Sequence, residues 1–157
     1  METTTASTEG PASETFEALY RAHSPALIRL GFLLTGSNEA AEDLVHDVFL
    51  RARSRMPLDH PASYLRAAVV NACRSHHRRA VVARRHQPPP APLVMPREVV
   101  EFRDLLLGLP LRQRAAVVLR YFCDLTDADI AELLACRPAT VRSLVHRGLA
   151  NLREVIQ

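Results

Sequence analysis

The side chains best suited to chemistry in this chain lie near its C-terminal end. Between Glu132 and Glu154 there are four arginines and one histidine, and no acidic residue. On a helix, the outward positions of this stretch would be Arg137, Thr140, Arg142, Ser143, His146 and Arg147. Guanidinium groups bond phosphate oxygens and the major-groove edge of guanine, so this face is suited to duplex DNA. The alternative is a basic helix face that contacts only solvent.

A second cationic stretch lies earlier in the chain. Residues 60–97 contain seven arginines, four histidines and no acidic residue, which gives a net charge of +7. Residues 1–59 carry a net charge of −4, and residues 98–157 are neutral. All 20 basic residues are arginines, so every cation can make bidentate contacts. This asymmetry, within a total charge of only +3, indicates a polyanionic partner such as nucleic acid.

The elements that carry these side chains are predicted to be helices. Apolar residues recur at helical spacing along the whole chain, and no segment shows the alternation expected of a strand. Residues 14–35 form an apolar helical pattern that Ser24-Pro25 interrupts. Because serine is a favoured N-cap and proline a favoured first helical residue, two separate helices are predicted there. The further helices are predicted over residues 39–55, 62–80, 98–107 and 111–122.

The basic C-terminal stretch is predicted to belong to a helix-turn-helix. Thr126 can cap a short helix whose first turn holds Asp129, in the manner of a capping box. Residues 135–137 then turn the chain, and Pro138 suits the first position of a last helix that ends near residue 154. The second helix of such a motif enters the major groove.

The domain organisation follows from a cluster of prolines in the middle of the chain. Prolines at this density oppose a helix and favour an extended connection. We therefore predict an all-α protein of two small helical domains, 14–80 and 98–157, with a disordered tail over 1–13 and a proline-rich linker over 81–97. The prolines are Pro88, Pro89, Pro90, Pro92 and Pro96.

Four segments together carry a family resemblance. Residues 109–153 read LPLRQRAAVVLRYFCDLTDADIAELLACRPATVRSLVHRGLANLR, and residues 16–36 read FEALYRAHSPALIRLGFLLTG. Residues 40–52 read AAEDLVHDVFLRA, and residues 60–79 read HPASYLRAAVVNACRSHHRR. The chain resembles the extracytoplasmic-function sigma factors of bacterial RNA polymerase. One departure is Ala135, where the family commonly has a glycine in the turn.

The resemblance implies a promoter-recognition subunit that is not an enzyme and needs no cofactor. Its expected partners are core RNA polymerase, through the β′ clamp and the β flap, promoter DNA and an anti-sigma factor. The last helix is expected to bind the minus-35 element through the six residues named first. Polymerase is expected to contact Asp43, His46 and Asp47. The minus-10 element is expected to contact Arg66, Asn71, Arg74, Arg78 and Arg79.

Two other functions are compatible with parts of the pattern. One is a stand-alone helix-turn-helix regulator that binds DNA as a dimer, and the weaker one is a metal-dependent nuclease. Cys73 with His76 and His77 lacks the second ligand pair of a zinc site, so no metal is expected. Three widely spaced cysteines favour a reducing cytoplasm. No apolar run approaches the roughly 20 residues of a membrane-spanning helix, so no membrane insertion is expected.

Overall fold

The computed structural model describes residues 15–83 and 95–157 and contains only helices within them. The predictions for the tail 1–13 and for residues 84–94 of the linker lie outside these residues. The all-α prediction is confirmed. The helices are α1 (Phe16–Thr35), α2 (Asn38–Arg53), α3 (Pro61–Ala83), α4 (Arg97–Leu107), α5 (Leu111–Tyr121), α6 (Asp127–Leu133) and α7 (Pro138–Ile156).

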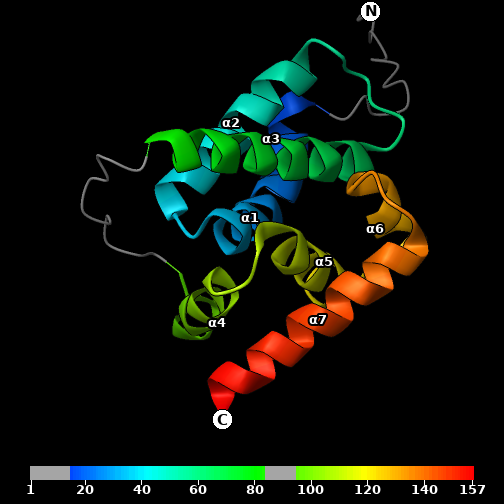
Figure 1. The fold of residues 1–157 in the computed structure, drawn as a ribbon. Helices are drawn as coiled ribbons and strands as arrows, with labels where there is room; N and C mark the ends of the chain where they lie inside the picture. Colours follow the sequence, from blue (N-terminus) through cyan, green and yellow to red (C-terminus); the bar gives the residue numbers. More distant parts are fainter. Residues whose placement is uncertain (1–14, 84–94) are drawn as a thin grey trace, which may run out of the picture.

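Helices α1, α2 and α3 pack against one another around a shared apolar core (Figure 1). Phe32 of α1, Phe49 of α2 and Leu65 of α3 are each fully buried there. The Thr15 side chain accepts a hydrogen bond from the backbone N–H of Ala18 and so caps the start of α1. These three helices hold both the acidic face of α2 and the basic face of α3 in fixed positions.

The predicted break in the first helix is wrong, because α1 continues through Pro25 without interruption. Proline removes one helical hydrogen bond. Apolar side chains on both sides of it, such as Leu19 and Leu30, are almost completely buried in the same core. Packing along one continuous face therefore stabilises a single helix in spite of the missing bond.

Helices α5, α6 and α7 form the second group and contain the predicted helix-turn-helix. The Thr126 side chain accepts a hydrogen bond from the Asp129 N–H and donates one to the Asp129 carboxylate, so the predicted cap is confirmed. Pro138 occupies the first turn of α7 as predicted. Ile130 and Val141 are fully buried and join the two helices of the motif.

The two groups touch each other directly. Helix α1 packs on α2 and α3 with one side and contacts α4 and α5 with the other (Figure 1). The ends of the predicted linker are helical, since α3 continues to Ala83 and α4 begins at Arg97. Residues 81–83 contain no proline and extend the helix that precedes them.

Candidate nucleic-acid interface

The outer face of α7 has the arrangement that a DNA-contacting helix needs. Val141, Leu144 and Val145 are buried against α5 and α6, which fixes the helix and turns its polar positions outward. Of the residues predicted to bind the minus-35 element, Thr140 is half-buried. The exposed ones are Arg137, Arg142, Ser143, His146 and Arg147. The structure therefore brings all six predicted residues together, Arg137 as the N-cap of α7 and the other five in its N-terminal part.

One of these arginines is held by a carboxylate of the preceding helix. Asp127, the first residue of α6, forms an ion pair with Arg120 of α5. Its other oxygen, Oδ2, lies 3.5 Å from Nη1 of Arg142, whose side chain is 63% exposed. Arg142 is thus oriented while most of its guanidinium stays free for a ligand. This role of Asp127 was not predictable from sequence, because the contact spans the turn between two helices.

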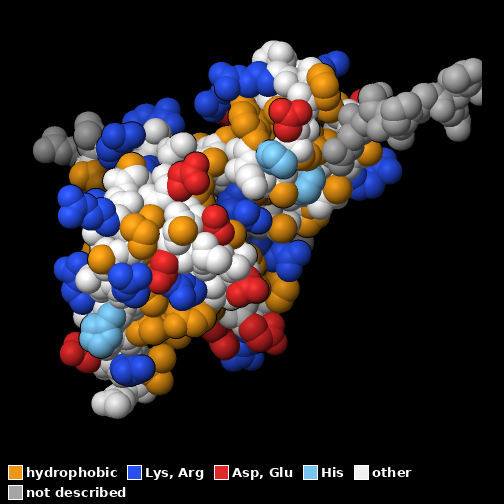
Figure 2. Space-filling view, turned by 90° about the vertical axis from the view of Figure 1, so that its right-hand side faces the viewer, with side chains coloured by type: hydrophobic (Ala, Val, Ile, Leu, Met, Phe, Trp, Pro, Cys, Tyr) orange, Lys and Arg blue, Asp and Glu red, His pale blue; other side chains and the backbone are white. Residues whose placement is uncertain are grey.

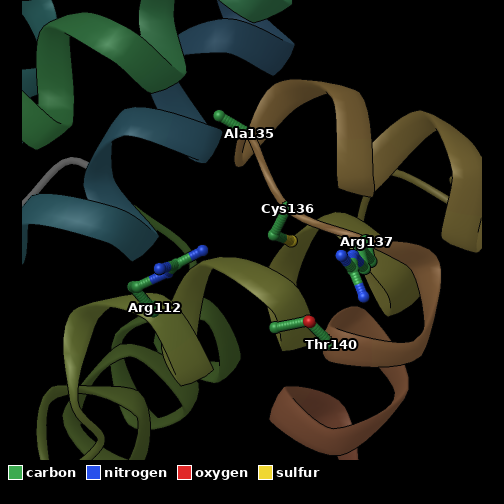
Figure 3. A pocket seen from close by; sticks show the side chains of 5 residues that line it. All are labelled: Arg112, Ala135, Cys136, Arg137 and Thr140. Atoms are coloured by element: carbon green, nitrogen blue, oxygen red, sulfur yellow. The ribbon is translucent and has the colours of Figure 1, made fainter.

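A shallow hollow lies where α7 begins (Figure 3). Thr140 lines it from α7, Ala135, Cys136 and Arg137 from the turn before this helix, and Arg112 from α5. The Arg112 side chain donates a hydrogen bond of 3.3 Å to the Leu134 carbonyl. The start of a helix attracts anions, so two arginines beside it make this hollow suitable for a phosphate group of the DNA backbone. Arg112 was missed, since it is 25 residues from Arg137 in sequence.

The basic face of α3 is only partly open. Asn71, Arg78 and Arg79 are exposed, while Arg66 and Arg74 are half-buried. A hollow between α2 and α3 is lined by Leu44, Asp47, Arg51, Ala68, Asn71, Ala72, Ser75, Arg78 and Arg79. It brings together three of the five residues predicted to bind the minus-10 element. It also adds Arg51 of α2, which the sequence analysis did not select.

Helix α2 presents its acidic side chains to solvent. Asp43, His46 and Asp47 are exposed, and Leu44 and Val45 beside them are buried in the core. The three predicted polymerase-binding residues therefore share one accessible surface. Of these three, Asp47 alone also lines the hollow between α2 and α3, where it faces the arginines. It marks the boundary between the acidic and the basic surfaces.

The Cys73 thiol is unsuited to bind a metal ion. Burial raises the pKa of Cys73 to about 12, so the thiol stays protonated at neutral pH, whereas a metal ligand must be a thiolate. In residues 15–83 and 95–157, no three His, Cys, Asp or Glu side chains are grouped so as to hold a metal ion. None of the helices within these ranges is long and apolar enough to span a membrane.

The charges on the surface are mixed as well as clustered. Figure 2 shows the side of the molecule that lies to the right in Figure 1, with arginine side chains spread among separate carboxylates. No single sign of charge therefore dominates this side of the molecule.

Comparisons with known proteins identify the family of this chain. Residues 19–81 match the family description "Sigma-70 region 2", and residues 100–152 match "Sigma-70, region 4". The ECF RNA polymerase sigma factor SigM of Mycobacterium tuberculosis is 32% identical over 153 residues, which cover 90% of this chain and 76% of SigM. The chain belongs to the extracytoplasmic-function sigma factors. The RNA polymerase sigma-E factor of Streptomyces coelicolor is 29% identical over 88% of this chain and 84% of that protein.

Solved structures show the same fold for this sigma factor. The sigma factor RpoE of Bartonella quintana, solved in complex with the anti-sigma factor NepR, superposes with a TM-score of 0.74 at 22% identity. The match covers 91% of this chain and 97% of RpoE. The extracytoplasmic-function sigma factor SigJ of Mycobacterium tuberculosis gives a TM-score of 0.64 at 25% identity, over 87% of this chain and 51% of SigJ.

The family decides between the functions considered above. Sigma factors direct RNA polymerase to promoters, and the two matched regions cover both helical groups of this chain. Promoter-directed transcription initiation is therefore the function of the chain, and the dimeric regulator is not favoured. The chain is a member of a family of transcription factors rather than of enzymes.

Proposed function

We propose that this sigma factor docks on core RNA polymerase through α2 and contacts the minus-10 element through α3 and the minus-35 element through α7. The observation that carries this proposal is the face of α7. It is largely exposed, it has no acidic residue before Glu154, and it follows a tight turn after a capped helix. Such a helix is shaped to enter the major groove.

The minus-35 contacts are divided between base edges and phosphates. Arg142 lies in the second turn of α7, and Asp127 orients it, so it is suited to a bidentate contact with guanine. Arg147 lies further along the helix, where its Nε donates a hydrogen bond of 3.3 Å to the Ser143 carbonyl. This position suits a phosphate contact. Arg137, with Thr140 and Arg112, would hold another phosphate at the start of α7.

The minus-10 contacts are assigned to the hollow between α2 and α3. An unstacked base of a melted promoter needs a polar group for its edge and cations for the adjacent backbone. Asn71 offers both a donor and an acceptor, and Arg78 and Arg79 supply the cations. Arg66 and Arg74 lie on the same helix and would contact the strand outside the hollow.

Polymerase docking is assigned to the exposed face of Asp43, His46 and Asp47. Two carboxylates on one face of a rigid helix attract a basic surface and steer its approach. The β′ clamp is the partner proposed for this face, and the β flap is proposed to bind the C-terminal helical group. Asp43 and His46 lie clear of the hollow between α2 and α3, so docking there leaves the DNA contacts accessible.

Other features of the proposal concern regulation and location. RpoE of Bartonella quintana forms a complex with an anti-sigma factor, and we propose a partner of the same kind for this chain. The three free cysteines fit the reducing cytoplasm in which transcription takes place. The chain is proposed to have no catalytic activity and no cofactor of its own.

Run-off transcription with purified core RNA polymerase tests the proposal. With genomic fragments as templates, discrete transcripts are expected only when the chain is added. Loss of these transcripts is expected for Arg142→Ala, whereas Arg153→Ala, an exposed arginine in the last turn of the same helix, should keep them. Absence of any promoter-specific product with the intact chain would contradict the proposed function.

A further inference from the structure

One carboxylate joins the three helices that surround the proposed minus-35 surface. Asp127, the first residue of α6, forms an ion pair with Arg120, which lies in the last turn of α5. Its second oxygen, Oδ2, lies 3.5 Å from Nη1 of Arg142 in α7. Two guanidinium groups from neighbouring helices therefore share one carboxylate.

The two ion pairs of this carboxylate differ in exposure. The side chains of Arg120 and Asp127 are 32% and 24% exposed, whereas that of Arg142 is 63% exposed. A partly buried ion pair is screened much less by water and salt than an exposed one. Arg120 therefore holds the carboxylate in place, and the carboxylate holds Arg142 by a longer and more exposed contact.

An arginine on a helix that faces DNA can donate to two kinds of acceptor. One is a phosphate oxygen, whose attraction for a cation is independent of sequence. The other is the edge of guanine, where O6 and N7 accept two bonds from one guanidinium group. The second contact requires a defined orientation of the planar group, and the first requires only its charge.

Asp127 favours the base contact of Arg142 over the phosphate contact. Its ion pair restricts the rotamers of the Arg142 side chain, so less conformational entropy is lost when that side chain binds guanine. Its negative charge also repels a phosphate that approaches the same guanidinium group, whereas the guanine acceptors carry no formal charge.

Arg147 of the same helix is the contrast to Arg142. Its Nε donates a hydrogen bond of 3.3 Å to the Ser143 carbonyl. Within the parts of the chain that the structure describes, no carboxylate forms an ion pair with it. The carboxylate of Asp127 thus distinguishes one exposed arginine of α7 from another.

We propose that Asp127 determines specificity as a positioning residue, which directs Arg142 to a base edge and away from the phosphates. The inference rests on the proposed function, because it assumes that α7 contacts the minus-35 element. Loss of the carboxylate then changes two kinds of binding in opposite directions. Sequence discrimination falls, while affinity for DNA of any sequence rises. A residue that only stabilised the fold would not have this pair of effects.

Asp127→Asn in the full chain tests the proposal, because the amide keeps the shape of the side chain and removes its charge. Discrimination between the minus-35 element and its single base-pair variants should fall roughly fivefold, since a misoriented arginine loses part of a bidentate contact. Affinity for mixed-sequence duplex DNA should rise. The slope of log affinity against log salt should steepen by about 1, as for one more neutralised phosphate. Asp127→Ser is a second neutral variant, with a smaller side chain.

Glu132→Gln is the matched control, because it removes a carboxylate from the same helix. Glu132 is exposed and forms no ion pair within residues 15–83 and 95–157. Its loss should leave discrimination unchanged. The second control is Asp127→Asn in an Arg142→Ala background. If Asp127 acts through Arg142, the added substitution should change neither discrimination nor the salt slope there.

Two measurements are needed, both on the full chain. Competition binding with core RNA polymerase, on a promoter selected by run-off transcription, gives the discrimination. Titration of the free chain with mixed-sequence duplex over a salt series gives the affinity and the slope. Unchanged discrimination in both neutral variants, no gain in mixed-sequence affinity, or the same changes without Arg142 would overturn the role of Asp127. Absence of any minus-35 preference in the intact chain would instead reject the proposed function, and the role of Asp127 with it.

Discussion

Helices α3 and α7 both expose arginines, but the two helix faces differ in how far they are buried. The polar face of α7 is mostly exposed, and its side chains contact the neighbouring helices, as in the 3.5 Å contact from Arg142 to Asp127 of α6. The face of α3 is partly covered, with Arg66 and Arg74 half-buried, and its exposed residues share a hollow with α2. The first surface is accessible as it stands, whereas part of the second is buried.

The difference fits the two tasks proposed for these helices. Contact with base edges in a duplex needs a rigid helix whose side chains are already oriented, because ordering them at the moment of binding weakens affinity. Capture of an unstacked base needs a hollow that fills only after the duplex has opened. A partly buried α3 face is compatible with this task, because an unstacked base can reach it only after the duplex has opened.

The largest effect is expected for Arg114→Ala, which removes the group that joins the two halves. Four carbonyl groups would lose a charged donor, and three of these bonds are buried. We expect the free energy of unfolding to fall by roughly 3 kcal/mol, as for the loss of hydrogen bonds to a buried charge. Urea denaturation, monitored by circular dichroism, measures this change in the free energy of unfolding.

The control for that prediction is Arg112→Ala on the same helix. Arg112 is exposed and makes one bond, to Leu134, so its removal should change stability by no more than about 0.5 kcal/mol. Equal losses of stability in Arg114→Ala and Arg112→Ala would contradict the view that Arg114 holds the two helical groups together.

The next effect concerns specificity on α7. Arg142→Ala should reduce discrimination between cognate and altered minus-35 sequences by about 1–3 kcal/mol, as expected for a lost guanine contact. Arg147→Ala should weaken binding about equally on every sequence, as a phosphate contact would. Competition binding in the presence of core polymerase measures both. Intact sequence preference in Arg142→Ala would show that another residue determines specificity.

A smaller effect is expected for polymerase docking through α2. Reversing Asp43 and Asp47 to arginine should weaken binding to core polymerase about tenfold, or roughly 1.4 kcal/mol, because like charges then meet at the interface. Both side chains are exposed, so the fold should be unaffected. The single variants separate the surfaces: Asp43→Arg should affect polymerase alone, while Asp47→Arg should also alter DNA binding through the hollow. Titration of labelled chain with core enzyme tests this.

Local features of the fold were predictable from sequence, and long-range ones were not. The Thr126 cap and the start of α7 at Pro138 follow from preferences of single residues, and the structure agrees with both. The continuity of α1 was missed, because a shared core, and not the residues around Pro25, decides it. The bond from Arg114 to Leu34 spans 80 residues of sequence, and nothing in the sequence distinguishes this arginine from the exposed Arg112 on the same helix.

The candidate site shows the same limit. The residues of α7 could be selected because one helix face carries them all. Arg51, Arg112 and Asp127 complete surfaces from neighbouring helices, and only the packing of those helices brings them there. The charge pattern selected the segments that we propose contact nucleic acid, but not the side chains that neighbouring elements add.

The smallest effect on stability is expected in the turn that precedes α7. Ala135 has a φ of 51°, in the left-handed region that favours glycine. A left-handed conformation costs an alanine roughly 1–2 kcal/mol, and glycine would avoid this cost. Part of the resulting gain in stability would be lost, because glycine has greater conformational freedom in the unfolded chain. Ala135→Gly should therefore raise the free energy of unfolding by about 0.5–1 kcal/mol, measured by urea denaturation.

Asp124 provides the matched comparison for that turn. It has a φ of 53° and is also exposed, but aspartate tolerates the left-handed region better than alanine does, through local hydrogen bonds. Asp124→Gly should thus raise the free energy of unfolding by less than Ala135→Gly does. Because Ala135 also lines the hollow at the start of α7, relief of its strain tests whether this turn sets the orientation of the helix. Higher stability with unchanged DNA binding would show that packing of Val141 and Leu144 orients α7, whereas weaker binding would show that the strained turn does.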